Sequence, residues 1–416
     1  MYCHIIDFLL KNDKIIISFD YKVIIMFENL KEIKLRLLTE AQINDYLCGD
    51  TGMSIIEHPN NPLIIGSNAL LKVNTNIGVS NKESLSDELE KLDTLSKLPY
   101  SPDSMMDHTI IKLEKPLWKY MVEMFDKPVG TLPHYSLFHK ERGIDIIQLL
   151  ETIDEMGESG ISFMTFHPTA TIALLEVAKQ DRIIPSTSRG GVLLLKDAQI
   201  NKRKTNIIVD YFDEILKICK KHHITISVGT AFRPACINEA LDRTQLLEIN
   251  EQKKYINYIK SKGVNTMMEG VGHLSLDKIK EYCGIIENIN TPLMPLGPMP
   301  TDATIGFDHV TSAIGATVIS LNGNVGIINS VTREEHTGGV PNLDSIIEGL
   351  KSARVAAHCI NLTRFNAYRS IDSAISSKRA LSKSCVISGG IFNNTLSNSV
   401  EGCSRCSFEC PLSLLM

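Results

Sequence analysis

Three cysteines stand close together near the C-terminal end of the sequence, in the stretch GCSRCSFECPLSLLM. Cys403, Cys406 and Cys410 follow the spacing C-x2-C-x3-C. Three thiols cannot all pair as disulfides, and structural zinc usually takes four protein ligands, whereas no fourth cysteine or histidine lies nearby in the sequence. Three thiolates leave one iron of a [4Fe–4S] cluster free to bind a small molecule. That is the arrangement used to cleave S-adenosylmethionine reductively, so the spacing predicts a cluster-binding tail.

Two histidines in glycine-containing segments form a candidate site for a divalent metal. His273 ends the segment MEGVGH, which also holds Glu269, and His336 lies in TREEHTGG after another strand-like run. Two histidines on separate strand ends can share one metal ion, with water and substrate completing the shell. The alternative is that each histidine only forms ordinary hydrogen bonds. We expect a divalent metal at His273 and His336.

Serine, arginine and glycine residues form a candidate anion site. The segment STSRGG (186–191) combines Ser188 and Arg189 with two glycines at a strand-to-helix junction. Such a loop binds phosphate through backbone N–H groups and a guanidinium. Arg233, followed by proline in FRPA, adds a second positive charge. Together these residues predict an anionic, phosphorylated substrate; the alternative is a helix cap followed by a solvent-facing arginine.

His309, in the segment GFDHVTSAIGAT, is a candidate for proton transfer near the substrate. The same position would also let the imidazole hold its own loop by a hydrogen bond, and both interpretations stay open. With Glu269, His309 is one of two candidate catalytic residues.

The composition is that of an ordinary globular protein. Among 416 residues, 43% are hydrophobic and 22% are charged, and the net charge of −5 with a pI near 6.2 gives no sign of a nucleic-acid-binding surface. The seven other cysteines are scattered, which suits a reducing compartment. Charged residues interrupt the apolar runs near the N-terminus, and no span approaches the roughly 20 residues needed to cross a bilayer. We expect a cytoplasmic protein without membrane or nucleic-acid partners.

Short apolar runs alternate with amphipathic stretches over most of the chain. The runs expected to form strands are 69–77, 127–135, 160–167, 182–188, 224–230, 264–270, 293–298 and 315–320. Helix-like patterns between them include 84–95, 145–157, 209–222 and 251–263. This alternation predicts βα units and a parallel sheet. About eight such units between Asn68 and Pro341 indicate an α/β fold of the (β/α)8 or TIM-barrel type.

Polar residues follow the apolar runs at the point where each run ends. In a barrel the C-terminal ends of the strands converge on one face, where the active site is built. We therefore expect one mouth to collect Asn76, Tyr135, His167, Ser188, Arg189, Arg233, Glu269 and Asp302.

The chain is expected to divide into four parts. Residues 1–67 form an N-terminal segment, 68–345 the catalytic barrel, 346–386 a C-terminal helical region, and 387–416 a linker with the iron–sulfur tail. The linker is rich in Gly, Asn and Ser, which predicts flexibility. A mobile tether would let the cluster swing over the barrel mouth.

Many of these stretches together resemble the ThiC superfamily of radical S-adenosylmethionine enzymes. The resemblance runs from Asn68 to His358 and resumes at the cysteine tail. It is carried by VNTNIGVS, PVGTLPHY, TSRGG, FRPACINEA, MEGVGHLSLDKI, LGPMPTDATIGFDHVTSAIGAT, TREEHTGGVPN and ARVAAH. The superfamily comprises the pyrimidine synthase of thiamine biosynthesis and its paralogue, the 5-hydroxybenzimidazole synthase of anaerobic cobalamin biosynthesis.

The resemblance implies a barrel with a helical C-terminal region, assembled as a homodimer in which the cluster tail of one subunit closes the barrel of the other. It implies 5-aminoimidazole ribotide as substrate, with S-adenosylmethionine, a [4Fe–4S] cluster, a zinc-type metal and an external electron donor; a paralogous subunit is an alternative partner. Substrate contacts would fall on Asn76, Met106, Tyr135, His167, Ser188, Arg189, Gly190, Arg233 and Glu269. The metal would fall on His273 and His336, and the cluster on Cys403, Cys406 and Cys410.

The sequence departs from the pyrimidine synthases in the substrate shell. They typically read G-D-G-L-R-P-G where this chain reads GTAFRPA, so Thr230 replaces an aspartate. They read F-Y-T-L-G-P where this chain reads LMPLGP, so Met294 replaces a substrate-facing tyrosine. In addition, I-H-A-G becomes FHPT, E-G-P-G-H becomes EGVGH, and the cysteine spacing is one residue shorter. Thr230 and Met294 are therefore expected to contact substrate, and the changes favour the 5-hydroxybenzimidazole synthase branch.

One expected function and two alternatives follow. The expected function is conversion of 5-aminoimidazole ribotide to 5-hydroxybenzimidazole, the lower-ligand precursor of cobalamin. The first alternative keeps the substrate and cofactors but yields the phosphomethylpyrimidine of thiamine biosynthesis. The second is a non-catalytic protein whose cysteine tail is a zinc or redox module.

Overall fold

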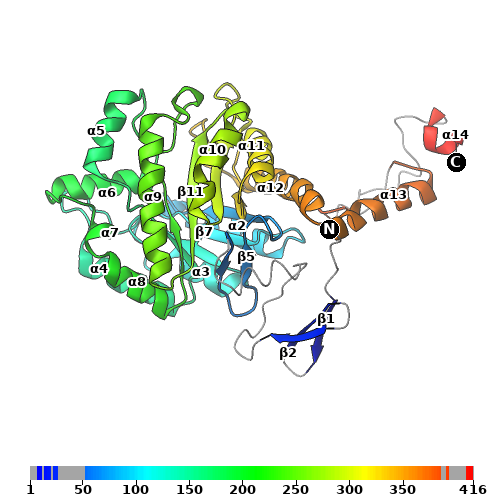
Figure 1. Ribbon diagram of the computed structural model, residues 1–416, viewed down its shortest axis with the longest axis horizontal. Helices are drawn as coiled ribbons and strands as arrows, with labels where there is room; N and C mark the ends of the chain where they lie inside the picture. The colour runs from blue at the N-terminus through cyan, green and yellow to red at the C-terminus, as the bar shows by residue number, and fades with distance from the viewer. Residues whose placement is uncertain are drawn as a thin grey trace.

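The computed structural model describes residues 7–11, 14–19, 22–26, 52–385, 390–392 and 409–415. Its centre is a sheet of eight strands in the order β12–β11–β10–β9–β8–β7–β6–β13, all parallel (Figure 1). A parallel bridge between Leu293 and Val325 brings the two ends of this order together. The sheet is therefore a nearly closed barrel, and the expected α/β fold of the TIM type is confirmed.

The barrel strands are short, and a helix follows each of them on the outside. The strands are β6 (Lys72–Ile77), β7 (Ser104–Asp107), β8 (Val129–Thr131), β9 (Phe163–Phe166), β10 (Thr225–Val228), β11 (Thr266–His273), β12 (Leu293–Met299) and β13 (Ile327–Asn329). The helices around them are α2 (Leu85–Lys97), α3 (Leu117–Met124), α4 (Ile146–Glu158), α8 (Phe212–Lys221), α9 (Arg243–Ser261), α10 (Ile279–Ile286), α11 (Asp308–Asn322) and α12 (Leu343–Arg364).

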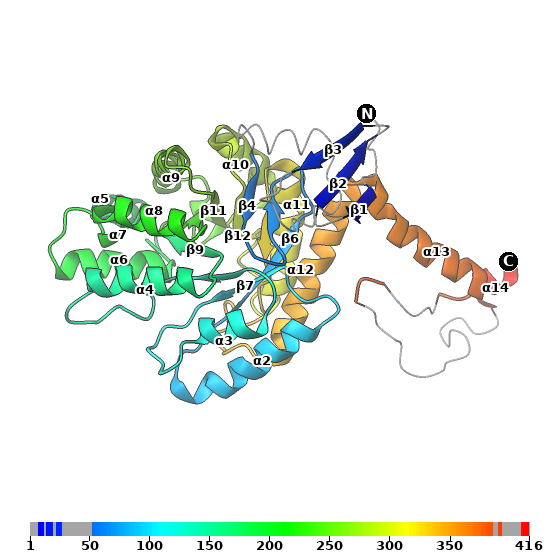
Figure 2. The same ribbon diagram turned by 90° about the horizontal axis from the view of Figure 1, so that it is seen from below.

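The connection between β9 and β10 is longer than the others and adds helices before α8. These are α5 (Ile172–Asp181), α6 (Arg189–Ile200) and α7 (Ile207–Asp210). They lie on the side of the barrel opposite α12 (Figure 2). Because α6 begins at Arg189, this insertion brings the predicted anion-binding segment to the barrel.

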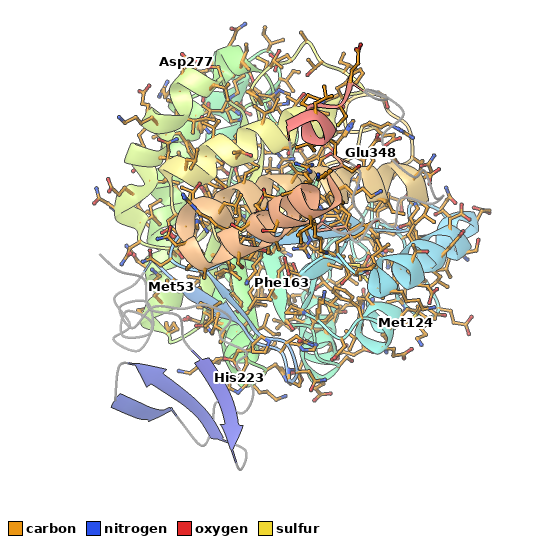
Figure 3. All side chains as sticks on the ribbon, turned by 90° about the vertical axis from the view of Figure 1, so that its right-hand side faces the viewer. Met53, Met124, Phe163, His223, Asp277 and Glu348 are labelled. Atoms are coloured by element: carbon orange, nitrogen blue, oxygen red, sulfur yellow. The ribbon has the colours of Figure 1, made fainter. Side chains whose placement is uncertain are left out.

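A hairpin closes the end of the barrel where the strands begin. Its strands are β4 (Ser54–Ile56) and β5 (Leu63–Ile65), paired antiparallel. Ile56 and Ile65 are fully buried in one apolar cluster with Phe163 of β9, and Thr225 Oγ1 donates to the Ile55 carbonyl oxygen at 2.7 Å. Figure 3 shows Met53 and His223 near this end and Asp277 near the opposite one. The hairpin fills the bottom of the barrel and leaves the other end for a site.

Six of the eight runs expected to form strands do so, and two do not. The run 182–188 is a loop that crosses from α5 to α6, and the run 315–320 lies inside α11. The buried positions of the run 315–320 are Gly315, Ala316, Ile319 and Ser320, which is a helical spacing. The two missing strands are β7 and β13, with only four and three residues. Such short strands give little periodic signal.

The expected C-terminal helices are present as α12 and α13 (Ser370–Ser382). α12 packs against α11, α2 and β6, and the expected boundary between residues 345 and 346 falls within it. α13 has no buried residue and runs away from the barrel (Figure 1). The remaining elements are a three-stranded antiparallel sheet of β1 (Asp7–Lys11), β2 (Lys14–Phe19) and β3 (Lys22–Met26), and α14 (Pro411–Leu415). The four-part division of the chain stays a prediction.

None of the helices in the described parts of the chain is both long enough and apolar enough to cross a membrane.

Candidate active site

A chain of amide side chains lines one side of the barrel. Asn74 Nδ2 on β6 donates to Asn76 Oδ1 at 2.7 Å and to Asn329 Oδ1 on β13 at 2.8 Å. Ser104 Oγ on β7 donates to Asn74 Oδ1 at 2.8 Å. Asn329 pairs in register with Asn74, and Asn76 lies two residues further along β6. The network therefore holds the Asn76 amide nearer to the C-terminal end of the barrel than the amides of Asn74 and Asn329.

A buried carboxyl group faces the barrel from the opposite side. Glu269 on β11 is 5% exposed, and its Oε1 accepts hydrogen bonds from Thr165 Oγ1 at 2.8 Å and Ser227 Oγ at 3.1 Å. Burial raises the pKa of Glu269, and the two hydroxyl groups and the charge of Arg233 oppose that rise. A carboxyl group in this setting is suited to proton exchange with a bound ligand.

Apolar side chains form the wall between these polar groups. Met294 on β12 pairs in register with Glu269, and Met106 on β7 pairs with Asn76. Both methionines belong to the same buried cluster as Tyr135. The structure thus brings the expected substrate residues Asn76, Met106, Tyr135, Glu269 and Met294 to one lining.

Three histidines and a tyrosine gather where β7, β8 and β9 end. Ring centroids are 6.0 Å apart for His108 and Tyr135, 5.3 Å for His134 and Tyr135, and 5.8 Å for His134 and His167. His134 and His167 each leave a buried Nδ1 without a partner among the described residues. His108 and His134 were not predicted: His108 directly follows the short strand β7, and His134 lies in the quoted motif PVGTLPHY.

The rings in this cluster are neutral at pH 7. Burial is the largest cause that lowers the pKa of His108 to about 4, and the nearby Arg189 and Arg233 lower it further. Burial lowers the pKa of His134 to about 4, against the opposing effect of its hydrogen bond to Gly190. Burial is also the largest cause that raises the pKa of Tyr135 to about 12, although Arg189 and Arg233 oppose that rise. The pKa of His167 is also lowered, chiefly by burial. The cluster therefore offers hydrogen bonds without charge.

The first turn of α6 is pressed against this cluster. His134 Nε2 donates to the Gly190 carbonyl oxygen at 3.3 Å, and a Cβ on Gly190 would lie 2.4 Å from His167 Cε1. Ser188 Oγ accepts from the Gly191 N–H at 3.2 Å, which makes Ser188 the N-cap of α6. Ser188 thus caps α6, and Arg189 is exposed; the anion-binding role of this segment stays a prediction.

Two guanidinium groups lie at the mouth. Arg189 and Arg233 both lower the pKa values of His108 and Tyr135, so both charges lie near this cluster. Arg233 also lowers the pKa of Glu269. Two positive charges beside a helix N-terminus form an environment that favours an anion.

His273 and His336 lie side by side, and the Nδ1 atom of each ring is hydrogen-bonded to a carboxylate. The ring centroids are 5.1 Å apart. His273 Nδ1 lies 2.6 Å from Asp302 Oδ1, and His336 Nδ1 lies 2.8 Å from Asp308 Oδ1. A carboxylate on Nδ1 fixes the tautomer and leaves Nε2 available, which is the usual support for a metal-binding histidine. The donor set fits a divalent metal bound by two histidines; the ion and its identity as zinc stay predictions.

Two predicted site residues point elsewhere. The Thr230 hydroxyl donates to Glu248 on α9 and not into the barrel lining. His309 lies on α11 with its Nε2 3.8 Å from Glu348 Oε1 on α12, at the place where Figure 3 labels Glu348. No contact among the described residues joins His309 to Glu269, and its role in proton transfer stays a prediction.

The cysteine tail is described only in part. Cys403 and Cys406 lie outside the described residues. Cys410 is 5% exposed and precedes α14, with its carbonyl oxygen accepting from Leu414 N at 3.0 Å. The cluster assignment to these three cysteines stays a prediction.

Comparison with known proteins decides the family. The profile of the radical SAM ThiC family matches residues 51–415. The chain belongs to this family. It is 34% identical to a phosphomethylpyrimidine synthase of Desulforamulus reducens over 321 residues, covering 74% of this chain and 73% of the relative. It is 32% identical to that of Thermodesulfovibrio yellowstonii (73% and 72% covered) and 31% identical to that of Archaeoglobus fulgidus (73% and 72% covered).

Among solved structures, a dihydropteroate synthase of Xanthomonas albilineans with 4-aminobenzoic acid superposes with a TM-score of 0.42 at 8% identity, covering 73% of this chain and 98% of that one. This likeness is too weak to bear on function.

Membership of the family makes the protein a radical SAM enzyme, which uses S-adenosylmethionine and an iron–sulfur cluster. This excludes the non-catalytic alternative. The relatives reported above are named for the pyrimidine and not for the benzimidazole product, so they do not support the expected branch.

Proposed function

We propose that the protein converts 5-aminoimidazole ribotide to a phosphomethylpyrimidine, the first alternative from the sequence. The observation that carries the proposal is the identity of 31–34% to relatives named phosphomethylpyrimidine synthase over about three quarters of the chain. The lining described above supports it, because it pairs an anion-favouring mouth with a buried carboxyl group.

In this proposal, different residues of the site bind different parts of the substrate. Arg189, Arg233 and the start of α6 hold the phosphate, and Asn76 orients the ribotide through its fixed amide. Met106 and Met294 exclude water from the reacting carbons. Glu269, whose pKa is raised by burial, takes up or returns a proton at its carboxylate oxygen. When bound, the cluster supplies the electron that cleaves S-adenosylmethionine to the radical that attacks the ribotide.

The second candidate is 5-hydroxybenzimidazole synthase. Met294 supports it, because this replacement of a tyrosine lies in the lining beside Glu269. Thr230 gives it less support than the sequence suggested, since its hydroxyl is engaged with Glu248 outside the lining. Of the two replacements relative to the pyrimidine synthases, only Met294 therefore lies in the lining that we propose binds the ligand.

We also propose a homodimer that exchanges cluster tails and draws on an external electron donor, with a paralogous subunit as the alternative partner. The support is geometric: α13 buries no residue, and α14 lies beside the far end of α13, away from the barrel (Figure 1). Both features support the proposal that the tail engages the barrel of a second subunit.

Genetic complementation tests the proposed product. The gene should restore growth of a strain that lacks its own pyrimidine synthase, without added thiamine. A Cys410→Ala variant should fail to do so, which ties growth to the cluster tail. Rescue only of benzimidazole-dependent cobalamin synthesis would replace the first candidate by the second.

A further inference from the structure

Two of the buried polar side chains of α9, those of Glu248 and Gln252, contact the backbone of the barrel strands and of the loops that follow them. Glu248 and Gln252 stand one helical turn apart and are each 1% exposed. By contrast, Glu251 on the same helix is partly exposed and pairs with Lys254 at 2.6 Å. Burying a carboxyl and an amide is costly unless both are fully hydrogen-bonded, so their partners indicate what they do.

Glu248 accepts four hydrogen bonds from two loops. Thr169 Oγ1, in the loop after β9, donates to Oε1 at 2.6 Å. The other three donors lie in the loop after β10: the Thr230 hydroxyl reaches Oε2, the Ala231 N–H reaches Oε1 at 2.6 Å, and the Phe232 N–H reaches Oε2 at 2.9 Å. One side chain thus joins the loop that follows His167 to the loop that carries Arg233.

The two backbone N–H groups require both oxygens of this side chain as acceptors. A hydroxyl group can rotate and exchange donor for acceptor, but an N–H cannot. Because the Ala231 and Phe232 N–H groups meet different oxygens, a glutamine at position 248 would always face one of them with its own NH2 group. The site therefore specifies a glutamate.

The loop after β10 is also held from its other side. Arg182 Nη1 donates to the Phe232 carbonyl oxygen at 2.7 Å, and its Nε is paired with Asp242 at 2.7 Å. Phe232 is therefore anchored at both its N–H and its carbonyl group. The side chain of Arg233, the next residue, therefore extends from a fixed backbone position.

Gln252 extends the same support to the next strand. Its Nε2 donates to the Glu269 carbonyl oxygen at 2.8 Å and to the Val228 and Gly229 carbonyl oxygens at 3.1 and 3.3 Å. The amide thus bridges the end of β10 and the middle of β11 from outside the barrel. It fixes the backbone from which the Glu269 side chain enters the lining.

We propose that Glu248 and Gln252 are positioning residues of the active site. From α9 they hold the loop of Arg233 and the segment of β11 that carries Glu269 in the one arrangement that binds an anionic ribotide. Neither touches the ligand. The identity of the ligand rests on the proposed function.

The test compares Glu248→Gln and Gln252→Met with Glu251→Gln, the exposed neighbour on the same helix, in the full chain. Hydrogen exchange over residues 229–236 reports loop position, and equilibrium binding of 5-aminoimidazole ribotide reports its consequence. A misplacement of about 1 Å can cost about 100-fold. We expect faster exchange and ribotide affinity weakened by about tenfold or more in the first two variants. Affinity for S-adenosylmethionine should stay at the wild-type value in all three.

Exchange over 229–236 that is as slow in both variants as in the wild type overturns the proposal. So does unchanged ribotide affinity, or equal weakening of ribotide and S-adenosylmethionine binding, which would mean general loss of structure. If Glu248→Gln does not fold, Gln252→Met decides by the same readouts. A wild-type protein that binds no ribotide defeats the proposed function, and the exchange comparison still decides whether Glu248 and Gln252 hold the loops.

Discussion

At the scale of single residues, the site depends on side chains kept neutral by burial. His134 is the clearest case: it is fully buried, and burial lowers its pKa to about 4. The unfolded chain regains a pKa of about 6.5 at this residue. Between these two values the unfolded state binds a proton that the folded state does not. The stability contributed by neutral His134 is therefore complete above about pH 6.5 and is lost as the pH falls toward 4.

A His134→Gln variant should be less sensitive to acid than the wild type. Glutamine can still donate to the Gly190 carbonyl oxygen but takes up no proton. The slope of the free energy of unfolding against pH between 4 and 6.5 should fall by up to about 1.4 kcal/mol per pH unit. Denaturant unfolding at several pH values measures it, with His139→Gln at an exposed position controlling for the substitution. An unchanged slope in His134→Gln would contradict this account.

The metal prediction also belongs to the residue scale. A His273→Ala, His336→Ala variant lacks both imidazoles and should not bind the metal. Asp302→Asn or Asp308→Asn should weaken the affinity for the metal about 10- to 100-fold, because the carboxylate no longer orients the imidazole. Metal analysis of protein purified without a histidine tag, with competition against a chromophoric chelator, measures both. His222→Ala, in the surface group with Asp154 and Glu158, is the matched control. A double variant with unchanged non-iron metal content would make the two histidines structural.

Sequence reasoning predicted many of the residues that the structure brings to one lining, because the ends of parallel strands share one face of a barrel. It could not tell which way a residue just beyond a strand end points. Thr230 follows β10 closely, yet its hydroxyl turns outward to Glu248. His309 lies on α11 beside α12, and no sequence pattern predicts that these two helices pack together. Asp302 was noted as polar, but its pairing with His273 depends on a loop conformation.

At the scale of elements, the N-terminus of α6 and the end of β9 fit together only because glycine stands between them. A Gly190→Ala change would place a Cβ 2.4 Å from His167 Cε1. Overpacking of this kind costs about 1–3 kcal/mol. We expect that loss in the free energy of unfolding together with weaker ribotide binding.

Gly284→Ala in α10 is the control, because no atom lies within 4 Å of the added Cβ. Alanine in a helix is favoured over glycine by about 0.5–1 kcal/mol, so this variant should be as stable as the wild type or more stable. Denaturant unfolding and ribotide titration of both variants check the pair. Equal behaviour of the two would show that the contact between α6 and His167 does not matter.

The elements themselves were predictable where they were long and periodic. The four quoted helix patterns correspond to α2, α4, α8 and α9. The run 182–188 looked like a strand because of its isoleucines, but Ile183 is 90% exposed and the loop is held by Arg182 and its partner Asp242. Such tertiary contacts outweigh the local preference of apolar residues for a strand, and they cannot be recognised from the sequence.

At the scale of the whole molecule, a hairpin covers the end of the barrel where the strands begin, and the inserted helices α5 to α7 lie on the side opposite α12 (Figure 2). The fold class followed from the repeat of strands and helices. The product did not follow from it, because a difference of about 1.4 kcal/mol between two barriers already changes a product ratio tenfold. Family membership fixes the type of chemistry, and we propose that a few side chains in the lining, Met294 among them, decide the product.

The most direct test of the proposed function is identification of the product. The purified protein is reconstituted with iron and sulfide without oxygen, reduced, and incubated with 5-aminoimidazole ribotide and S-adenosylmethionine. Chromatography with mass detection should then show a phosphorylated pyrimidine together with 5′-deoxyadenosine, and a Glu269→Gln variant should form less of the pyrimidine. A fluorescent benzimidazole without phosphate, in the absence of the pyrimidine, would contradict the proposed product and establish the second candidate.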